Sequence, residues 1–342
     1  MRGIVCAEIG RFELVDDLPE PVPQAGHAVV AVRRVGICGT DYHAYRGHQP
    51  YFAYPRILGH ELAGVIAEVG PNGQGLRAGD PVSVIPYLHC GTCIACRSGK
   101  TNCCTNLKVL GVHVDGGLRE RISVPVSHLM ATPNLTPDET AAIEPLAIGA
   151  HAVRRSGLRA GETALVIGAG PIGLGVAAFA KRKGAKVIAM DVSDDRLAFC
   201  GRWAKADGLV NPLREPEPIE RIAALNGGEC PTVVFDATGS ARSMADSFAY
   251  AAHGGTVVFV GLVKADVAFS DPEFHKRELT LMGSRNATRE DFAEAADAIA
   301  AGGVDIGRYV THRAGFADMI ERFGDWLKPE SNVIKAMVEM PI

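Results

Sequence analysis

The stretch TALVIGAGPIGLG, residues 163–175, is the clearest indication of fold in this 342-residue chain. It opens with a short, continuous apolar run, which is typical of a strand buried on both faces of a parallel sheet. The residues PIGLGVAAFAKRKG (171–184) read as a helix that Gly184 closes. Between the strand and the helix lies the pattern Gly-x-Gly-x-x-Gly. The stretch therefore predicts a strand, a tight turn and a helix in immediate succession.

The three glycines of that turn predict a dinucleotide site. Gly168 allows the tight turn, and Gly170 lets the backbone approach a pyrophosphate. The helix N-terminus, where Pro171 and Ile172 stand, attracts the phosphate charge. Gly173 allows the helix to pack closely on the strand. The alternative is a glycine-rich turn without a ligand, and the order of strand, turn, helix, strand and acid favours the ligand.

The choice of nucleotide depends on the acid that closes the next strand. The run KVIAMD (186–191) ends in Asp191, 21 residues after Gly170. A carboxylate at this place accepts hydrogen bonds from the adenosine ribose and repels a 2′-phosphate. Arg196 could instead reach a phosphate, or it could be a surface arginine of the following helix. We therefore expect NAD rather than NADP.

The residues on either side of this motif predict two domains. After residue 145, strands alternate with helices, which implies a parallel sheet built from βαβ units. The further strands are expected at 232–239, 255–262 and 279–284. Before residue 145, short runs alternate apolar and polar residues, as half-buried strands do. These runs are 27–37, 62–70 and 80–86. The predicted fold class is α/β, with a doubly wound parallel sheet beside a β-rich domain.

Composition and charge exclude several classes of partner. The net charge is −4, and no run of Lys or Arg indicates binding to nucleic acid or to anionic lipid. No apolar stretch reaches the length of about 18 residues that indicates a membrane span. The first residues, MRGIVCAEIGRFELV, read as a strand or hairpin rather than a signal peptide. We therefore expect a reducing cytoplasm, where closely spaced cysteines are metal ligands or redox groups.

A cysteine-rich segment, HCGTCIACRSGKTNCC (89–104), predicts a closed metal site. Four of its cysteines follow the spacing C-x2-C-x2-C-x7-C: Cys90, Cys93, Cys96 and Cys104. Four thiolates saturate tetrahedral zinc and leave no position for a substrate, so this zinc would be structural. Redox exchange through C-x-x-C is the weaker alternative. Cys103 is surplus to the spacing.

A second set of residues is scattered, and each member has an ordinary explanation when taken alone. The set comprises Cys38, Thr40 and His43 in GICGTDYH, His60 and Glu61 in LGHE, and Glu144 in AAIEPLAIGAHA. Together they supply a thiolate, an imidazole and carboxylates, which suit a zinc ion with an open position. The residues alone leave open whether Glu61 or Glu144 would be the carboxylate ligand.

The motifs Cys38-Gly-Thr-Asp-x-His43 and Gly59-His60-Glu61-x-x-Gly64 resemble those of the zinc-containing medium-chain alcohol dehydrogenases. The cysteine cluster and the glycine turn follow in that family's order, and the resemblance runs essentially the length of the chain. The stretch EPLA after Ile143 is similar to the polyol and threonine dehydrogenase branch. There a glutamate stands where the simple-alcohol enzymes carry a cysteine ligand.

The resemblance implies an architecture. A GroES-like catalytic domain would comprise residues 1–147 and 288–342, with the structural zinc lobe at 89–104. A Rossmann NAD-binding domain would comprise residues 148–287. The family places its active site in the cleft and usually forms dimers or tetramers, so we expect a homo-oligomer.

The resemblance also implies a mechanism with two zinc ions per chain. Cys38, His60 and a glutamate would hold the catalytic zinc, which should acidify a bound alcohol as it acidifies bound water. Thr40 would meet the substrate oxygen, and a proton relay would pass through the nicotinamide ribose to His43. The hydride would then go to NAD.

The substrate is expected to be a secondary alcohol of a polyol or sugar acid. Polar residues stand where the simple-alcohol enzymes have an apolar pocket: Arg46, His113, Arg285 and Asn286. An arginine can hold a carboxylate with two parallel hydrogen bonds. Several segments look most like sugar-acid dehydrogenases of the L-galactonate 5-dehydrogenase kind.

The sequence leaves three alternative functions to weigh. L-Threonine, or sorbitol and general alcohols, could be the substrate. A zinc-free NADPH-dependent quinone reductase would lack the cysteines and histidine described above. A non-enzymatic binding protein could reuse the fold, although it would need neither the ligand set nor the relay.

Overall fold

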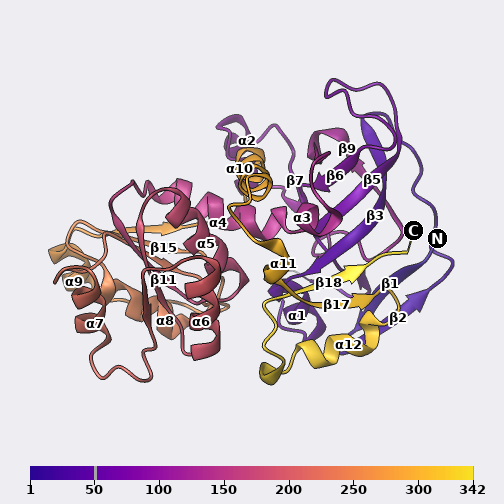
Figure 1. Ribbon diagram of the computed structural model, residues 1–342. Helices are drawn as coiled ribbons and strands as arrows, with labels where there is room; N and C mark the ends of the chain where they lie inside the picture. The colour runs from indigo at the N-terminus through magenta and orange to yellow at the C-terminus, as the bar shows by residue number, and fades with distance from the viewer. Residues whose placement is uncertain (50–51, 342) are drawn as a thin grey trace. The chain divides into compact units, whose positions relative to one another are not determined.

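The computed structural model describes residues 1–49 and 52–341 (Figure 1). The chain divides into two compact units, one formed by Met1–Glu144 with Thr288–Ile342 and the other by Pro145–Ala287. No helix among the described residues is long and apolar enough to span a membrane. The α/β fold class expected from the sequence is confirmed.

The Pro145–Ala287 unit is built on a six-stranded sheet in which every pairing is parallel. In spatial order its strands are β13 (Gly208–Val210), β12 (Lys186–Met190), β11 (Thr163–Ile167), β14 (Val233–Asp236), β15 (Thr256–Phe259) and β16 (Thr280–Gly283). All five residues of β11 are buried, which explains its continuous apolar run. The chain proceeds outward from β11 to β13 and then returns to β14 on the other side. Ligands of such sheets bind where the strand order reverses, which here lies between β11 and β14.

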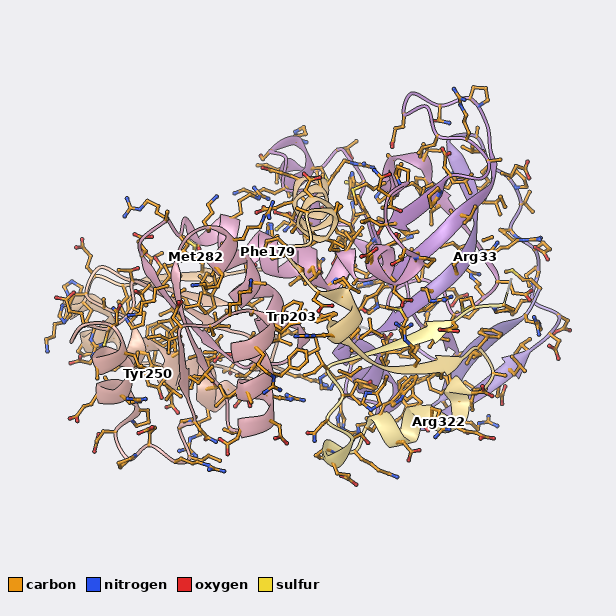
Figure 2. The ribbon with its side chains drawn as sticks, viewed as in Figure 1. Arg33, Phe179, Trp203, Tyr250, Met282 and Arg322 are labelled. Carbon is orange, nitrogen blue, oxygen red and sulfur yellow. The ribbon has the colours of Figure 1, made fainter. Side chains whose placement is uncertain are left out.

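Helices connect these strands, as the alternating pattern predicted. They are α5 (Pro171–Arg182), α6 (Asp194–Trp203), α7 (Pro218–Leu225), α8 (Ala241–Asp246) and α9 (Asp271–Lys276), with a 3₁₀ turn η3 (Ser247–Tyr250) after α8. The helix α4 (Ile143–Ser156) precedes β11. Gly184 follows α5 with φ of +84°, the left-handed conformation that ends a helix readily when the residue is glycine. Phe179 of α5 is 2 % exposed and belongs to the core of this unit (Figure 2).

The other unit is rich in antiparallel strands. Its largest sheet runs β10 (Leu129–Ala131), β6 (Pro81–Val84), β5 (Glu61–Val69), β3 (His27–Ile37), β18 (Lys335–Glu339) and β17 (Val310–Gly315), with β9 (Arg121–Pro125) also paired to β3. The first residues, expected to be a strand or hairpin, form a hairpin of β1 (Gly3–Glu8) with β2 (Arg11–Val15), and β1 also pairs with β4 (Arg56–Ile57). A two-stranded sheet joins β7 (Tyr87–Leu88) to β8 (Lys108–Val109).

Short helices complete this unit. They are α1 (Gly39–Tyr45), α2 (Ile94–Arg97), α3 (Pro137–Ala141), α10 (Arg289–Ala300), α11 (Ile306–Tyr309) and α12 (Met319–Trp326), with 3₁₀ turns η1 (Thr101–Cys103), η2 (Val126–His128) and η4 (Pro329–Ser331). The last strand, β18, returns from the far end of the sequence to pair antiparallel with β3, so that Ala336 faces Ile37 (Figure 1). The C-terminal residues therefore help to build the part of the unit where Cys38 lies.

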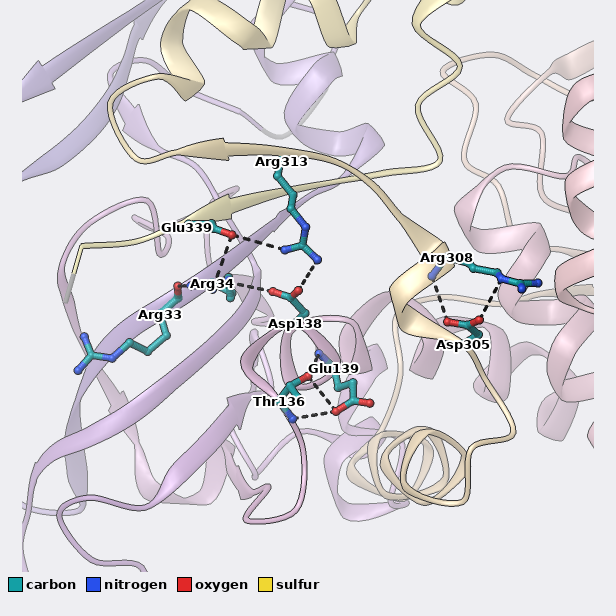
Figure 3. A network of polar contacts seen from close by, with 9 residues as sticks. All are labelled: Arg33, Arg34, Thr136, Asp138, Glu139, Asp305, Arg308, Arg313 and Glu339. Carbon is teal, nitrogen blue, oxygen red and sulfur yellow. Dashed lines mark hydrogen bonds and ion pairs between the residues drawn. The ribbon is translucent and has the colours of Figure 1, made fainter.

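An ion-pair network ties four elements of this unit together (Figure 3). Asp138 of α3 accepts a hydrogen bond from Arg34 of β3 at 2.9 Å and another from Arg313 of β17. Both arginines also lie within 3.7 Å of Glu339 of β18. Burial alone would raise the pKa of Asp138, but the hydrogen bonds and charges of the two arginines lower it below its ordinary value. The charged form of Asp138 thus holds α3 to the sheet.

We expect Asp138→Asn to lower the free energy of unfolding at pH 7 by about 2 kcal/mol, because it weakens two hydrogen bonds between charged groups. Since the pKa of Asp138 is lowered by folding, its contribution is complete above the ordinary Asp range and is lost as pH falls through the lower folded value. Urea unfolding at pH 7 and at a series of acidic pH values measures both effects. Equal stability of variant and wild type at pH 7 would contradict the network's role.

Candidate active site

Two neighbouring strands bring Cys38, His60 and Glu61 together. Cys38 follows the end of β3 and caps the N-terminus of α1, while His60 immediately precedes β5, whose first residue is Glu61. The two strands are antiparallel, and Gly36 lies opposite Glu61. One ligand atom from each of Cys38, His60 and Glu61 can be chosen so that all lie within 4.8 Å of one another.

Gly36, which the sequence analysis did not single out, makes room for this cluster. A Cβ atom added at Gly36 would lie 2.1 Å from Oε2 of Glu61 and 2.9 Å from its Cβ. Non-bonded atoms do not approach one another so closely. The Glu61 side chain therefore occupies the space that the Cβ of any other residue type would fill at position 36. Glycine is required at this point of β3 for packing and not for backbone conformation.

Asp41, a second residue that sequence reasoning missed, lies behind His60. Its side chain is 1 % exposed, and its Oδ2 accepts a hydrogen bond from the backbone N–H of Cys38 at 2.8 Å. Its Oδ1 lies 3.8 Å from Nδ1 of His60. Burial acts to lower the pKa of His60, but Asp41 and Cys38 together raise it well above the ordinary value. A carboxylate behind an imidazole is the usual arrangement that orients a histidine ligand.

Glu61 is held by a buried cation from the last strand. Lys335 of β18 is 2 % exposed and donates to both carboxylate oxygens of Glu61, at 2.5 and 2.7 Å, and to the carbonyl of Ile37 at 3.1 Å. Burial acts against the charge of Lys335, but Glu61 raises the pKa of the amine above its ordinary value. The two charges therefore neutralise each other in the interior.

Glu144 is in a different position from Glu61. It lies in the first turn of α4, is 2 % exposed, and accepts a hydrogen bond at Oε1 from the hydroxyl of Tyr87. Its Oε2 is buried and has no hydrogen-bond partner among the described residues. Burial raises the pKa of Glu144 to about 7, with Glu61 adding to the rise and His60 opposing it. Glu61 is therefore the carboxylate that lies close to Cys38 and His60. Glu144 is the carboxylate that has one oxygen without a hydrogen bond.

The donors around His60 fit a zinc ion. Cys38, His60 and Glu61 lie close together, and the nearby Glu144, whose charge acts on His60, has a buried Oε2 without a partner among the described residues. Buried polar atoms of this kind are costly unless something pairs with them. Sulfur, nitrogen and oxygen donors in this mixture are typical of zinc sites that retain an open position.

The helix α1 carries the two expected relay residues. Thr40 stands near its N-terminus, two residues after Cys38, and His43 is exposed one turn further on. Desolvation by neighbouring atoms, with the nearby charges of His48 and Arg46, lowers the pKa of His43. His43 is therefore neutral around pH 7 and able to accept a proton.

Aromatic packing fixes α1 in place. Tyr42 and Tyr45 of α1 both pack against Phe323 of α12, with ring centroids 5.2 and 5.0 Å away. Arg46, at the C-terminus of α1, donates to the carbonyl of Leu327 at 3.1 Å. The helix that follows Cys38 thus rests on a second element from the C-terminal part of the chain.

The cysteine lobe forms a separate group. The ligand atoms of Cys90, Cys93, Cys96 and Cys104 all lie within 4.8 Å of one another. Hydrogen bonds from Thr92 lower the pKa of Cys90 to about 5, which favours the thiolate that metals bind. Cys103 is exposed and lies outside this group of four.

The glycine turn of the Pro145–Ala287 unit has the expected geometry. Gly168 has φ of +93°, and a Cβ atom at Gly173 would lie 1.7 Å from the carbonyl oxygen of Gly168. Asp191 follows β12 and accepts backbone hydrogen bonds from Ala169 at 2.6 Å and Ser193 at 2.8 Å. Asp191 therefore braces the turn as well as standing at the position expected for ribose binding.

Arg196 lies close to the same turn, because its Nη1 is 3.8 Å from the position of a Cβ built on Gly170. Pro171 and Ile172 begin α5, as expected. Asp236 was missed by the sequence analysis: it is fully buried at the end of β14 and accepts hydrogen bonds from Thr238 and a very short one from Ser243. These bonds fix the loop that packs against Gly168.

The four expected substrate residues divide between the two units. Arg46 and His113 belong to the β-rich unit, and Nδ1 of His113 accepts a hydrogen bond from the N–H of Val109 at 3.1 Å. Arg285 and Asn286 belong to the other unit, and Asn286 adopts φ of +52°. Their role in substrate binding stays a prediction.

Comparison with known proteins agrees with this two-part fold. Residues 24–134 match the family model of the alcohol dehydrogenase GroES-like domain, and residues 171–301 match that of the zinc-binding dehydrogenases. The L-galactonate-5-dehydrogenase of Escherichia coli K12 is 46 % identical over 321 residues, which cover 93 % of each chain.

Two solved structures share the whole fold. An alcohol dehydrogenase of Escherichia coli CFT073, solved with NADH, is 30 % identical and superposes with a TM-score of 0.91 over 99 % of both chains. A zinc-binding dehydrogenase of Sinorhizobium meliloti, bound to NADP, is 29 % identical with a TM-score of 0.90 over 99 % of this chain and 98 % of the other. The chain belongs to the zinc-dependent alcohol dehydrogenase family.

Proposed function

We propose that this enzyme oxidises a secondary hydroxyl of a sugar acid, an aldonate such as L-galactonate or L-gulonate, with NAD as the hydride acceptor. The observation that carries the reaction type is the group formed by Cys38, His60 and Glu61, near which Oε2 of Glu144 is buried with no hydrogen-bond partner among the described residues. The substrate class is supported by the 46 % identity to an L-galactonate-5-dehydrogenase over nearly the whole chain.

Cys38, His60 and Glu144 would hold the catalytic zinc. Glu144 is favoured over Glu61 because both oxygens of Glu61 already accept from Lys335, whereas Oε2 of Glu144 accepts from no described residue. When bound, zinc acts as a Lewis acid that favours loss of a proton from an alcohol. Cys90, Cys93, Cys96 and Cys104 would hold a second, structural zinc.

The remaining residues would move the proton and bind the coenzyme. Thr40 would hydrogen-bond the substrate hydroxyl, and His43, neutral at pH 7, would receive the released proton at the surface. The turn at Gly168 and the N-terminus of α5 would bind the pyrophosphate of NAD. Asp191 would meet the adenosine ribose and disfavour the 2′-phosphate of NADP, although Arg196 lies near enough to the turn to contact a phosphate.

We expect His43→Ala to lower kcat/KM by about 10²-fold and to remove the acid limb of its pH profile. In the wild type, kcat/KM should fall only as pH drops through the lowered pKa of His43, because a protonated imidazole cannot accept the substrate proton. In His48→Ala the limb should persist and move to higher pH, because one of the charges that lower the pKa of His43 is gone. An unchanged acid limb in His43→Ala would exclude this role.

A screen of NAD reduction tests the proposal. The panel contains the aldonates L-galactonate, L-gulonate and L-gluconate, together with sorbitol, L-threonine and ethanol. We expect the highest kcat/KM for an aldonate and a higher kcat/KM with NAD than with NADP. Exclusive activity on simple alcohols would overturn the substrate class, and a preference for NADP would overturn the role given to Asp191.

We further propose that the enzyme forms a homo-oligomer, a dimer or tetramer. The strand β16 is an edge strand of its sheet, and Leu281 on it is 38 % exposed. Exposed apolar edge strands favour pairing with another chain. Sedimentation at equilibrium measures the mass, and a monomer would contradict the expectation.

A further inference from the structure

We propose that Tyr87 is a positioning residue for the catalytic metal: its hydroxyl holds Oε1 of Glu144 and so presents Oε2 as the single free oxygen. The inference rests on the proposed function, because it assumes that Glu144 is a ligand of the catalytic zinc. Neither the motif spacing nor the sequence pattern around Tyr87 indicated a role for it.

The position of Tyr87 is closely determined. It begins β7, where it pairs with Val109 of β8, and only 3 % of it is exposed. The ring of Phe292 from α10 meets the tyrosine ring edge-on, with centroids 6.1 Å apart and planes at 82°. A buried tyrosine with its ring packed in this way can vary little in rotamer, so its hydroxyl defines a fixed point in the interior.

The hydrogen bond has a defined direction. The Tyr87 hydroxyl donates the hydrogen bond to Oε1 of Glu144. Glu144 has no hydrogen at Oε1 when ionised, so it accepts. The carboxylate is thus held at one oxygen, which restrains rotation about its terminal bond.

The contrast with Glu61 shows what this bond achieves. Lys335 donates to both oxygens of the Glu61 carboxylate, so this carboxylate is fixed in place but both of its oxygens are already hydrogen-bonded. The carboxylate of Glu144 is held at one oxygen only, and the other is buried and unpartnered among the described residues. One tether fixes the orientation of a ligand while leaving one donor atom available, which is the usual function of hydrogen bonds to metal ligands.

The test compares Tyr87→Phe with a matched control, Tyr42→Phe. Both changes remove one buried phenol hydroxyl, but the hydroxyl of Tyr42 has no hydrogen-bond partner among the described residues. Zinc affinity of the catalytic site is measured by competition with a chromogenic chelator, and the cysteine lobe serves as internal reference. Cobalt is then exchanged into the catalytic site, and its visible spectrum reports the ligand geometry.

We expect Tyr87→Phe to weaken zinc binding at the catalytic site by about tenfold or more and to change the cobalt spectrum. Tyr42→Phe should match the wild type in both measurements. The lobe zinc and the binding of NADH should be unaffected in either variant, which shows that the chain still folds.

A double-mutant cycle separates a role through Glu144 from a general loss of packing. If Tyr87 acts through Glu144, Tyr87→Phe should have no further effect on zinc affinity in a Glu144→Gln background. An equal loss in both backgrounds, or no loss in Tyr87→Phe alone, would overturn the inference while leaving the proposed function intact. A wild-type chain that binds zinc only in the lobe would instead overturn the proposed function and the inference together.

Discussion

Cys38→Ser is expected to lower kcat by about 10³-fold or more while leaving NADH binding and the overall fold intact. The change removes the sulfur donor of the group formed by Cys38, His60 and Glu61 and replaces it with a hydroxyl, which is a poor zinc ligand at neutral pH. Loss of several kcal/mol of charge stabilisation corresponds to a rate loss of this size. Steady-state NADH formation and fluorescence titration with NADH measure the two quantities.

Cys103→Ser is the matched control for this prediction. Cys103 is an exposed cysteine that belongs to neither ligand group among the described residues, so the same change of side chain should leave kcat unaltered. Wild-type turnover in Cys38→Ser, or an equal loss in Cys103→Ser, would refute the assignment of Cys38 as a metal ligand.

Gly36→Ala should reduce kcat/KM by at least about 10²-fold. The added methyl group would overlap the Glu61 carboxylate, whose Oε2 lies 2.1 Å from the new carbon, and would force it away from Lys335 and the ligand cluster. Displacements of about 1 Å near reacting groups cause losses of this order. Zinc in the catalytic site should also decrease, while the lobe keeps its own.

Gly39→Ala is the control on the other side of Cys38. No heavy atom lies within 4 Å of a Cβ added there, and alanine is a good helix former at the start of α1. Its kinetics should therefore equal those of the wild type. Wild-type activity in Gly36→Ala would show that the space beside Glu61 is not needed for the site.

Much of the fold could be predicted because short sequence patterns reflect how each strand, turn or helix end is packed in the folded chain. The run at β11 is apolar throughout since both faces of the strand are buried, and the glycines at 168 and 173 are required by backbone conformation and by close contact. Helix ends such as Gly184 likewise follow from local chemistry. The pairing of β18 with β3, which places Ala336 opposite Ile37, joins distant parts of the sequence, so no local pattern indicates it and only the structure shows it.

The candidate site likewise contains residues that the sequence indicates and residues that only the structure reveals. Cys38, His60 and the cysteine lobe stand in short motifs whose spacing indicates metal binding. Lys335 and Tyr87 act on Glu61 and Glu144 through contacts between distant parts of the chain, so no spacing could reveal them. The choice between the two glutamates likewise depends on which carboxylate oxygen is already hydrogen-bonded, and only three-dimensional structure shows that.

The zinc content of the purified wild-type enzyme tests whether the chain holds a catalytic zinc in addition to the zinc of the cysteine lobe. One ion is expected in the cysteine lobe and one on Cys38, His60 and Glu144, so elemental analysis should give about two zinc ions per chain. Cys38→Ser should hold about one. A wild-type content of one zinc, retained unchanged in Cys38→Ser, would contradict the catalytic metal site.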